Sequence, residues 1–168
     1  MGRSWLLLGA AVAALASCRE PTAPRAAVTL HLDRDGYVAT PIGTDPARYA
    51  FRVVVRYENM TDSSIWFEKC MPGDRTPIFS VPTTDGSDSG YDIGWGCVGM
   101  PPVEFPPGAA RTDTLLVQGP NVFDHSTHKP FGVIAGYFRL EYFTLKCDTS
   151  CYGAGPRVAS AAFWVWPL

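Results

Sequence analysis

Apolar and polar residues alternate along much of the chain after residue 27. The segment 49–58 has the clearest pattern, because apolar side chains occupy every second position and charged ones fall between them: Phe51, Val53, Val55 and Tyr57 against Arg52, Arg56 and Glu58. A repeat of two residues is typical of a β-strand with one buried and one solvent-facing side. We therefore predict a half-buried strand at 49–58.

Further segments of the same kind predict more strands. They lie at 28–32, 37–40, 65–70, 77–81, 112–118, 133–146 and 158–166, and Gly136 is expected to bend the longest of them. Outside the first 17 residues no 3.6-residue apolar repeat predicts a helix, and the 15 prolines and 16 glycines disfavour long helices. About seven or eight short strands joined by turns predict an all-β fold, an antiparallel β-sandwich.

Several motifs occur in an order that points to a known class of domain. After Tyr57-Glu58-Asn59 come Thr61-Asp62-Ser63, Ile65-Trp66-Phe67, Ile78-Phe79-Ser80-Val81, Asp85-Gly86, Pro106-Pro107-Gly108, Thr112-Asp113-Thr114-Leu115, Gly136-Tyr137-Phe138-Arg139-Leu140 and the segment 160–165. This order resembles bacterial immunoglobulin-like domains, nearest to the small domain named for an intracellular proteinase inhibitor of bacilli. The resemblance implies an immunoglobulin-like sandwich and raises proteinase inhibition as one alternative function. Phe138 departs from the pattern, because such strands often place there a tyrosine that caps a corner.

The first 18 residues carry the features of an export signal. Arg3 is followed by an uncharged apolar stretch at 5–14, which is too short to span a membrane, and then by Leu15-Ala16-Ser17-Cys18. This motif resembles the lipobox of bacterial lipoproteins, which implies cleavage before Cys18 and lipid attachment to its thiol. Two or more acyl chains hold a protein firmly to a membrane. Arg19 replaces the aspartate that often signals inner-membrane retention, so the resemblance favours the outer membrane where the source has one.

These features divide the chain into three parts. We expect a signal peptide, helical in its apolar core, at 1–17, a lipid-anchored tether at 18–26 that contains Pro21 and Pro24, and a single sandwich domain at 27–168. The expected location is the cell envelope, outside the cytoplasm. The net charge of −2 and the lack of a basic stretch give nucleic-acid binding no electrostatic support.

Cysteine usage agrees with an exported chain. Besides Cys18 there are four cysteines, and an even number in an oxidising compartment predicts two disulfides. Three pairings are possible, and we favour Cys70–Cys97 and Cys147–Cys151 because each pair brackets a loop rich in glycine, proline and aspartate. A zinc site made by the four thiols is the alternative, but the spacing contains no C-x-x-C pair.

The sequence offers only weak signals for catalysis or metal binding. Ser87-Asp88-Ser89-Gly90 lacks the second glycine of a nucleophile elbow, and no histidine is placed to activate a serine. Asp85, Asp88 and Asp92 lack the spacing of a calcium loop. His125 and His128 fall in a proline-flanked segment, 119–132, that is expected to be a loop. We therefore predict no catalytic residue and no cofactor.

The last strand contains the most suggestive binding residues. If Phe163 and Val165 face the core, Trp164 and Trp166 face the opposite way, about 6.7 Å apart at two residues' rise. Exposed indoles at this spacing stack on sugars or anchor a protein. The more frequent arrangement covers both rings, here by the N-terminal segment or by 119–132. The function we predict is non-enzymatic binding or assembly, first with an envelope protein, and alternatively with a surface or wall glycan.

Overall fold

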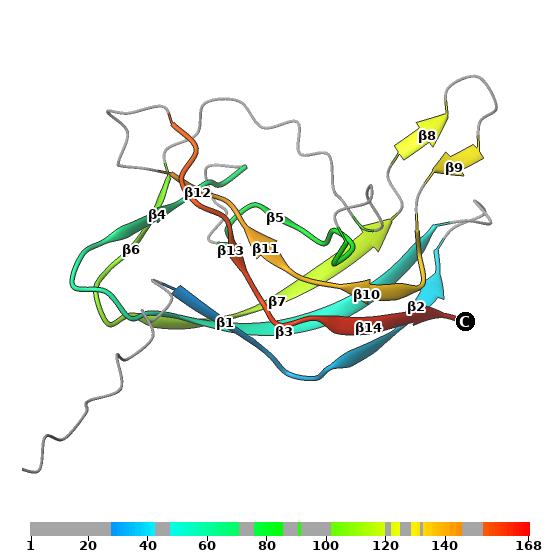
Figure 1. Cartoon of the computed structure of the whole chain (residues 1–168), viewed down its shortest axis with the longest axis horizontal. Helices are drawn as coiled ribbons and strands as arrows, with labels where there is room; N and C mark the ends of the chain where they lie inside the picture. The colour runs from blue at the N-terminus through cyan, green and yellow to red at the C-terminus, as the bar shows by residue number, and fades with distance from the viewer. Residues whose placement is uncertain are drawn as a thin grey trace, which may run out of the picture.

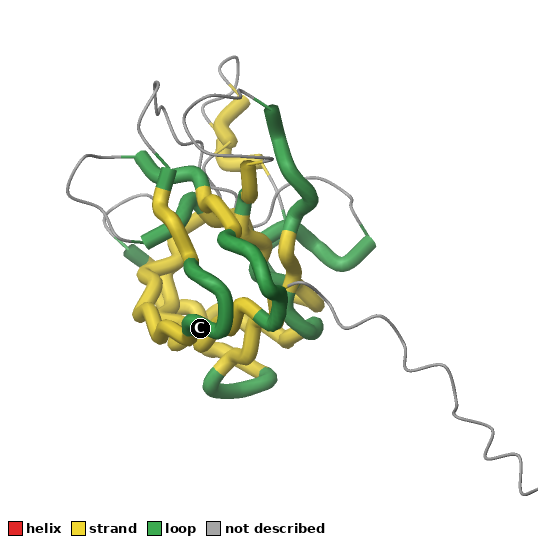
Figure 2. Tube along the Cα trace, turned by 90° about the vertical axis from the view of Figure 1, so that its left-hand side faces the viewer, coloured by secondary structure: helices red, strands yellow, loops and turns green. Residues whose placement is uncertain are grey.

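The structure is a computed structural model that describes residues 28–42, 48–70, 76–85, 91, 102–119, 122–124, 129–131, 133–145 and 153–168. The described residues are all-β: they form several sheets and contain no helix (Figure 2). Fourteen strand segments occur among them: β1 (Val28–Leu32), β2 (Gly36–Pro41), β3 (Tyr49–Asn59), β4 (Ile65–Phe67), β5 (Phe79–Ser80), β6 (Val103–Phe105), β7 (Ala110–Gly119), β8 (Val122–Asp124), β9 (Lys129–Phe131), β10 (Gly136–Phe138), β11 (Glu141–Tyr142), β12 (Thr144–Leu145), β13 (Val158–Ala159) and β14 (Phe163–Pro167).

Six of these strands form the largest sheet. Its order is β1-β3-β2-β14-β10, with β7 paired along the other edge of β3. Two three-stranded sheets, β13-β11-β5 and β12-β4-β6, lie above it in Figure 1. Among the described strands all pairs are antiparallel except β2 with β14, which run parallel from Gly36↔Trp164 to Ala39↔Pro167. This pair joins the beginning of the described chain to its end.

Strand β3 is organised as its alternating sequence predicts. Its residues Phe51, Val53, Val55 and Tyr57 are buried, whereas Arg52 and Arg56 are exposed. Strand β7 pairs with β3 in register from Tyr49↔Gly119 to Glu58↔Ala110. The prediction of a half-buried strand at 49–58 is therefore confirmed.

Aromatic side chains fill much of the core in two groups. Tyr57, Phe67, Phe105 and Tyr142 contact one another with ring centroids 4.8–5.7 Å apart. The second group contains Tyr37, Phe51, Tyr91, Phe138 and Phe163, and its members contact one another mostly edge to face. Such tilted contacts add to the free energy gained by burying the rings themselves.

The strands near the C-terminus are shorter than predicted. The expected strand 133–146 is three segments, β10, β11 and β12, and the first begins at Gly136, whose φ of 141° favours glycine. The expected strand 158–166 is likewise divided into β13 and β14. The number of strands, about seven or eight, was therefore wrong, because bends and bulges divide single sequence segments into several pieces.

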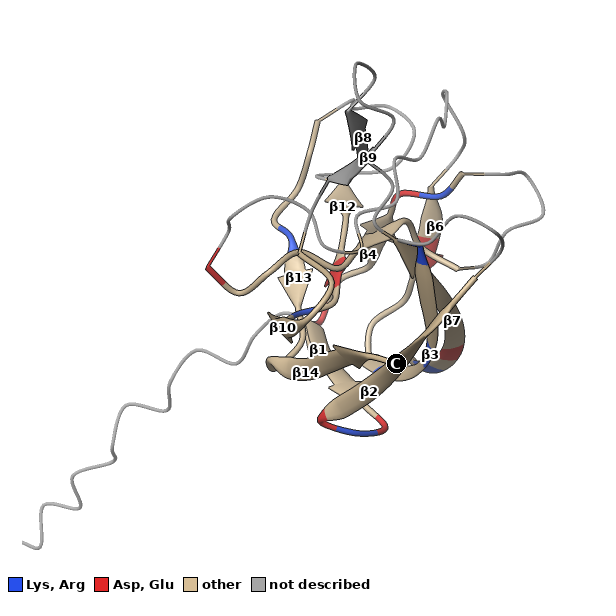
Figure 3. Ribbon diagram, turned by 90° about the vertical axis from the view of Figure 1, so that its right-hand side faces the viewer, with Lys and Arg blue, Asp and Glu red and all other residues tan. Residues whose placement is uncertain are grey.

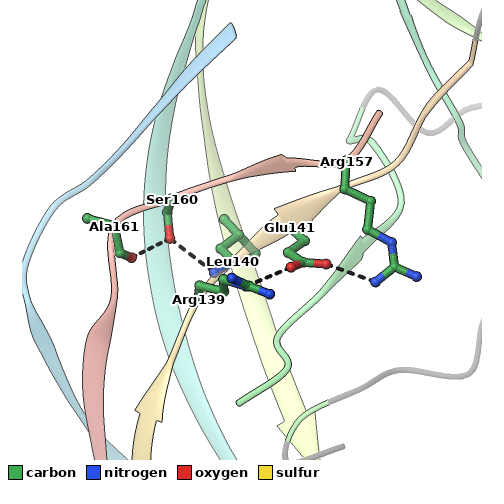
Figure 4. Close-up of polar contacts among 6 residues, drawn as sticks. All are labelled: Arg139, Leu140, Glu141, Arg157, Ser160 and Ala161. Carbon is green, nitrogen blue, oxygen red and sulfur yellow. Dashed lines mark hydrogen bonds and ion pairs between the residues drawn. The ribbon is translucent and has the colours of Figure 1, made fainter. Parts of the chain in front are cut away.

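A β-bulge explains the break between β13 and β14. Phe138 pairs with Phe163, and Glu141 pairs with Ala159. Between these two pairs, residues 139–140 on one strand face the three residues 160–162 on the other. The Leu140 N–H donates to Ser160 Oγ at 3.0 Å, and Ser160 Oγ donates to the Ala161 carbonyl at 2.7 Å (Figure 4). A bulge of this kind shifts the alternation by one residue and so re-aims the side chains that follow it.

Two other predictions need correction. The segment 119–132, expected as a loop, contains the antiparallel pair β8–β9, with Phe123 opposite Pro130. Strand β6, which pairs with β4, was not predicted. Its three residues, Val103-Glu104-Phe105, are too few for a two-residue repeat to stand out among the surrounding prolines.

Candidate functional site

Three exposed aromatic side chains lie together on the outer face of the large sheet. They are Tyr137 of β10 and Trp164 and Trp166 of β14, with exposed fractions of 59%, 39% and 42%, and we call them the aromatic strip. Val38 of β2, 39% exposed, continues the strip on the neighbouring strand. The preceding bulge sets the alternation in β14 that directs both indoles outward.

Strand pairing fixes the order of these side chains. Tyr137 is opposite Trp164 and Val38 is opposite Trp166, so the four residues cross three adjacent strands. The rings of Tyr137 and Trp164 meet edge to face, with centroids 4.7 Å apart and planes at 72°. Cross-strand aromatic pairs of this kind stabilise a sheet and order both rings.

A glycine on β2 makes room for the second indole. A Cβ atom at Gly36 would lie 2.8 Å from Cζ3 and 3.2 Å from Cη2 of Trp166. The ring of Trp166 therefore rests against the backbone of Gly36, in the space that the side chain of any other residue at position 36 would fill. This close approach holds Trp166 on the sheet while leaving part of the ring in solvent.

The opposite side of β14 belongs to the core. Phe163 is 1% exposed and Val165 is fully buried. The two indoles thus project from a strand that is anchored in the core by Phe163 and Val165, which gives the strip a rigid base. The assignment of Phe163 and Val165 to the core is confirmed, whereas the expectation that both indoles are covered was wrong.

An ion-pair cluster lies further along the chain from Tyr137, where β10 of the large sheet leads into β11 of the sheet β13-β11-β5. Glu141 is buried, and its two carboxylate oxygens contact two arginines: Arg139 Nε lies 2.7 Å from Oε1, and Arg157 Nη1 donates to Oε2 at 2.9 Å (Figure 4). We call Arg139 and Arg157 the arginine pair. Their side chains are 40% and 59% exposed, and the guanidinium of Arg157 also lies 4.8 Å from the centroid of the Phe143 ring.

The turn that leads into β2 is held by a single carboxylate. Asp33 Oδ1 accepts hydrogen bonds from the Tyr37 hydroxyl at 2.8 Å and from the Val54 N–H at 3.1 Å. Burial raises the pKa of Asp33, but these hydrogen bonds and the Arg34 cation outweigh burial and lower it below its ordinary value. Burial and the bond to Asp33 raise the pKa of Tyr37. This clamp fixes the strand that carries Gly36 and Val38.

A second buried polar pair supports β3. The Tyr57 hydroxyl donates to Asp113 Oδ2 at 2.9 Å, and Arg111 forms an ion pair with Asp113 at 2.9 Å. Burial, and then the Asp113 carboxylate, raise the pKa of Tyr57 above its ordinary value. Both groups are satisfied within the core, so this pair stabilises the fold and is not exposed to a ligand.

One recess contains a histidine. His31 lines an open cavity of about 410 Å³ together with Leu30, Leu32, Arg34, Asp35, Ala161 and Ala162. None of these described lining residues is a serine or cysteine that a histidine would activate. Among the residues that the structure describes, no group of three or more histidine, cysteine or acidic side chains is arranged to hold a metal ion.

Several residues singled out from the sequence lie outside the described residues. These are Cys18, Asp88, Ser89, Asp92, Cys97, His125, His128, Cys147 and Cys151. Cys70 is described and is disulfide-bonded. Because all the other cysteines lie outside the described ranges, the pairings Cys70–Cys97 and Cys147–Cys151 remain predictions.

Sequence reasoning missed part of this surface. We did not identify Gly36, Tyr137 or the arginine pair from the sequence. The repeat of two residues that begins at Gly136 is a signal for Tyr137, because it places the Tyr137 side chain on the face opposite to that of the buried Phe138. No sequence pattern links Arg139 to Arg157, because the two are brought together by strand pairing across the bulge.

Comparisons with known proteins give little further information. No protein-family model matches the chain, and no curated protein matches it. Among solved structures it is similar to one described as the X-ray structure of Northeast Structural Genomics Consortium target SoR45, with 13% sequence identity and a TM-score of 0.43 over 83% of this chain and 86% of the other. A similarity at this TM-score carries no argument about fold or function. In the described part of the chain, no helix has the length and apolar character needed to cross a membrane.

Proposed function

We propose that this protein is a lipid-anchored binding module of the cell envelope, and that the aromatic strip is its contact surface. The observation that carries the proposal is the exposure of Tyr137, Trp164 and Trp166 together on one rigid sheet face. Large aromatic side chains lose solvent contact at a small cost in conformational entropy, so they act as anchors in many interfaces. The proposed role is binding or assembly without catalysis.

The proposed anchor rests on the N-terminal sequence. Leu15-Ala16-Ser17-Cys18 matches the lipobox pattern, and the prolines at 21 and 24 stiffen the segment that follows. A lipid on Cys18 would hold the domain close to a membrane surface, because the seven residues 19–25 span at most about 25 Å. In a bacterium with two membranes, we place the protein at the outer one, because Arg19 follows the cysteine.

We further propose that the sheets form an immunoglobulin-like sandwich. Strands β1, β3 and β7 are neighbours in one sheet, and β5, β11 and β13 are neighbours in another. These orders are compatible with the first, second and fifth strands of such a domain in one layer and its third, sixth and seventh strands in the other. A fold of this class hosts many functions, so it lends no weight to proteinase inhibition.

The size of the strip favours a glycan over a protein as partner. With about 150–250 Å² for a complete aromatic side chain, the strip and Val38 expose roughly 300–400 Å² of apolar area. A stable protein interface covers about 800 Å² on each partner. A flat aromatic area with charged groups at its rim is also the arrangement expected for sugar binding. We retain a protein partner as the second candidate, because the area is that of a small docking site.

In-cell crosslinking of the full-length protein tests the proposal. The wild-type chain is compared with the double variant Trp164→Ala/Trp166→Ala, and the material crosslinked to each is identified by mass spectrometry and by sugar analysis. Leu116→Ala is a matched control, because Leu116 is 44% exposed on the distant strand β7. We expect the double variant, still folded by circular dichroism, to lose a crosslinked species that the control retains. Equal recovery from all three proteins would contradict the proposal.

A further inference from the structure

We infer that the arginine pair and the aromatic strip form one continuous binding surface for an acidic polysaccharide. This inference rests on the proposed function, since it names the ligand class of the same surface. It assigns sugar-ring stacking to Tyr137, Trp164 and Trp166, and it assigns recognition of the carboxylate, sulfate or phosphate groups of the polysaccharide to Arg139 and Arg157.

The first argument is continuity along the chain from β10 into β11. Phe138 and Leu140 are fully buried, so Tyr137 and Arg139, which alternate with them, point away from the core as the chain passes from β10 in the large sheet to β11 in the sheet β13-β11-β5. Side chains two residues apart in an extended segment are separated by about 6.7 Å. A cationic group therefore follows directly after the last ring of the strip, with no strand between them.

The second argument is charge. Glu141 contributes one carboxylate and the arginine pair contributes two guanidinium groups, so these three side chains together carry one net positive charge, on a chain whose total is −2. Both arginine side chains remain partly exposed, whereas Glu141 is buried beneath them and is 4% exposed. The surface therefore presents cations and not the anion to an approaching ligand.

The third argument is orientation. Arg157 is held between the Glu141 carboxylate and the Phe143 ring, and Arg139 is held by the other oxygen of the same carboxylate. Each guanidinium has five N–H donors, so one contact to Glu141 leaves donors for a second anion. A pre-oriented planar guanidinium suits oxyanions, because it forms paired charge-assisted hydrogen bonds with them.

The fourth argument explains why sugars suit the strip. The C–H faces of a pyranose ring are apolar and slightly positive, and they fit the negative face of an aromatic ring. Tyr137 and the two indoles provide such faces across two neighbouring strands. A chain of charged sugars can therefore place its rings on the strip and its anionic groups on the arginine pair.

Calorimetry with the full-length protein in detergent tests the inference. The probes are polygalacturonate, hyaluronan and heparin, with fully methyl-esterified polygalacturonate as the matched neutral chain. We expect at least one acidic probe to bind, and the affinity for polygalacturonate to exceed that for its ester by at least about tenfold, the effect of one charge-assisted contact. Binding of the acidic probe is also expected to weaken as salt is added.

Single variants locate the effect on the surface. Arg157→Gln leaves Glu141 paired with Arg139, and it is expected to reduce affinity for the acidic probe about tenfold while leaving the neutral chain unaffected. Arg56→Gln is the matched control, because Arg56 is also exposed and paired with a glutamate two residues later, but on β3. It is expected to change neither affinity. Urea denaturation of each variant checks that the fold is retained.

The other outcomes separate this inference from the proposed function. Equal binding of polygalacturonate and its ester, unaffected by Arg157→Gln, would overturn the inference and leave a glycan-binding strip. Failure of all three acidic probes to bind would also overturn it, and the proposed function would stand if a partner crosslinked through the strip. If Trp164→Ala/Trp166→Ala also left every crosslinked species unchanged, the proposed function would fail as well.

Discussion

Strands β3 and β14 belong to the same sheet and alternate in the same way, but their outward sides differ. Both bury aromatic and aliphatic residues, Phe51 and Val53 in β3 and Phe163 and Val165 in β14. Outward, β3 presents Arg52, Arg56 and Glu58, whereas β14 presents two indoles and no charge. Figure 3 shows this contrast, with charged residues along β3 and none along β14 or β2. A charged outer side is typical of a strand that meets only solvent. The exposed indoles of β14 depart from it, and this difference is the basis of the binding role that we propose.

The two sides of β14 should respond very differently to truncation. Phe163→Ala removes a ring that is 1% exposed, and we expect it to lower the free energy of unfolding by about 3–5 kcal/mol. Trp164→Ala removes a partly exposed ring and is expected to cost about 1 kcal/mol, the size of one cross-strand aromatic contact. Urea denaturation followed by circular dichroism measures both changes. A cost for Trp164→Ala as large as that for Phe163→Ala would mean that the indole is part of the core.

The buried side of β3 contains a polar contact that offers a sharper test. Tyr57→Phe removes the hydroxyl that donates to Asp113, and we expect a loss of about 1–3 kcal/mol because a buried carboxylate loses a donor. Tyr142→Phe is the matched control, since its buried hydroxyl makes no hydrogen bond within the described part of the structure. The control is expected to be neutral or slightly stabilising. Equal losses in the two variants would contradict this difference.

Alkaline pH should destabilise the protein by ionising tyrosines that are buried in the core. Burial raises the pKa of Tyr37, Tyr57, Tyr91 and Tyr142 above the ordinary value of 10.0. Above pH 10 the unfolded chain loses the phenolic protons that the folded state keeps. The contribution of these tyrosines to the free energy of unfolding is therefore complete below pH 10 and falls as the pH rises above it. Each such group lowers the free energy of unfolding by about 1.4 kcal/mol per pH unit in that range.

Urea denaturation between pH 8 and pH 11.5, with tyrosinate absorbance recorded in parallel, measures this dependence. We expect the stability to be level up to about pH 10 and to fall beyond it, with the buried tyrosines ionising only as the protein unfolds. Ionisation of all tyrosines at an ordinary pKa in a protein that remains folded would contradict the buried positions described here.

A small effect on stability, about as large as that of Trp164→Ala, is expected at Gly36. Gly36→Ala places a Cβ 2.8 Å from the outer edge of the Trp166 ring, and we expect the ring to move outward at a cost of about 1 kcal/mol. Intrinsic tryptophan fluorescence should shift toward longer wavelength, and partner binding should weaken. Gly108→Ala is a useful contrast, because a Cβ at that position would meet no atom within 4 Å, but the φ of 67° makes the substitution strained. An unchanged fluorescence spectrum for Gly36→Ala would contradict the contact.

The sequence predicted local alternation well and long-range assembly poorly. The burial of Phe51, Phe163 and Val165 followed from a repeat of two residues that each strand carries in itself. The pairing of β2 with β14 joins residues more than a hundred positions apart, and no local pattern indicates it. For the same reason the contact of Trp166 with Gly36 was not predictable. The contact of Arg157 with Glu141 was not predictable either, because it depends on the pairing of β11 with β13.

Strand breaks were also beyond the sequence pattern. The bulge at 160–162 depends on hydrogen bonds between the Ser160 hydroxyl, the Leu140 N–H and the Ala161 carbonyl, which form only when the two strands meet. The sequence 158–166 alternates well enough on both sides of this point to suggest one strand. The exposure of the indoles was likewise decided by the neighbouring strands and not by the strand that carries them.

Site-specific photo-crosslinking in cells tests the central claim most directly. Tyr137→p-benzoylphenylalanine places a photoreactive group on the aromatic strip, and Leu116→p-benzoylphenylalanine places the same group at an exposed position on β7. We predict that irradiation attaches a partner molecule, a polysaccharide in the first instance, through position 137 and not through position 116. Adducts at position 116 alone, or equal adducts at both positions, would contradict the assignment of the aromatic strip as the contact surface.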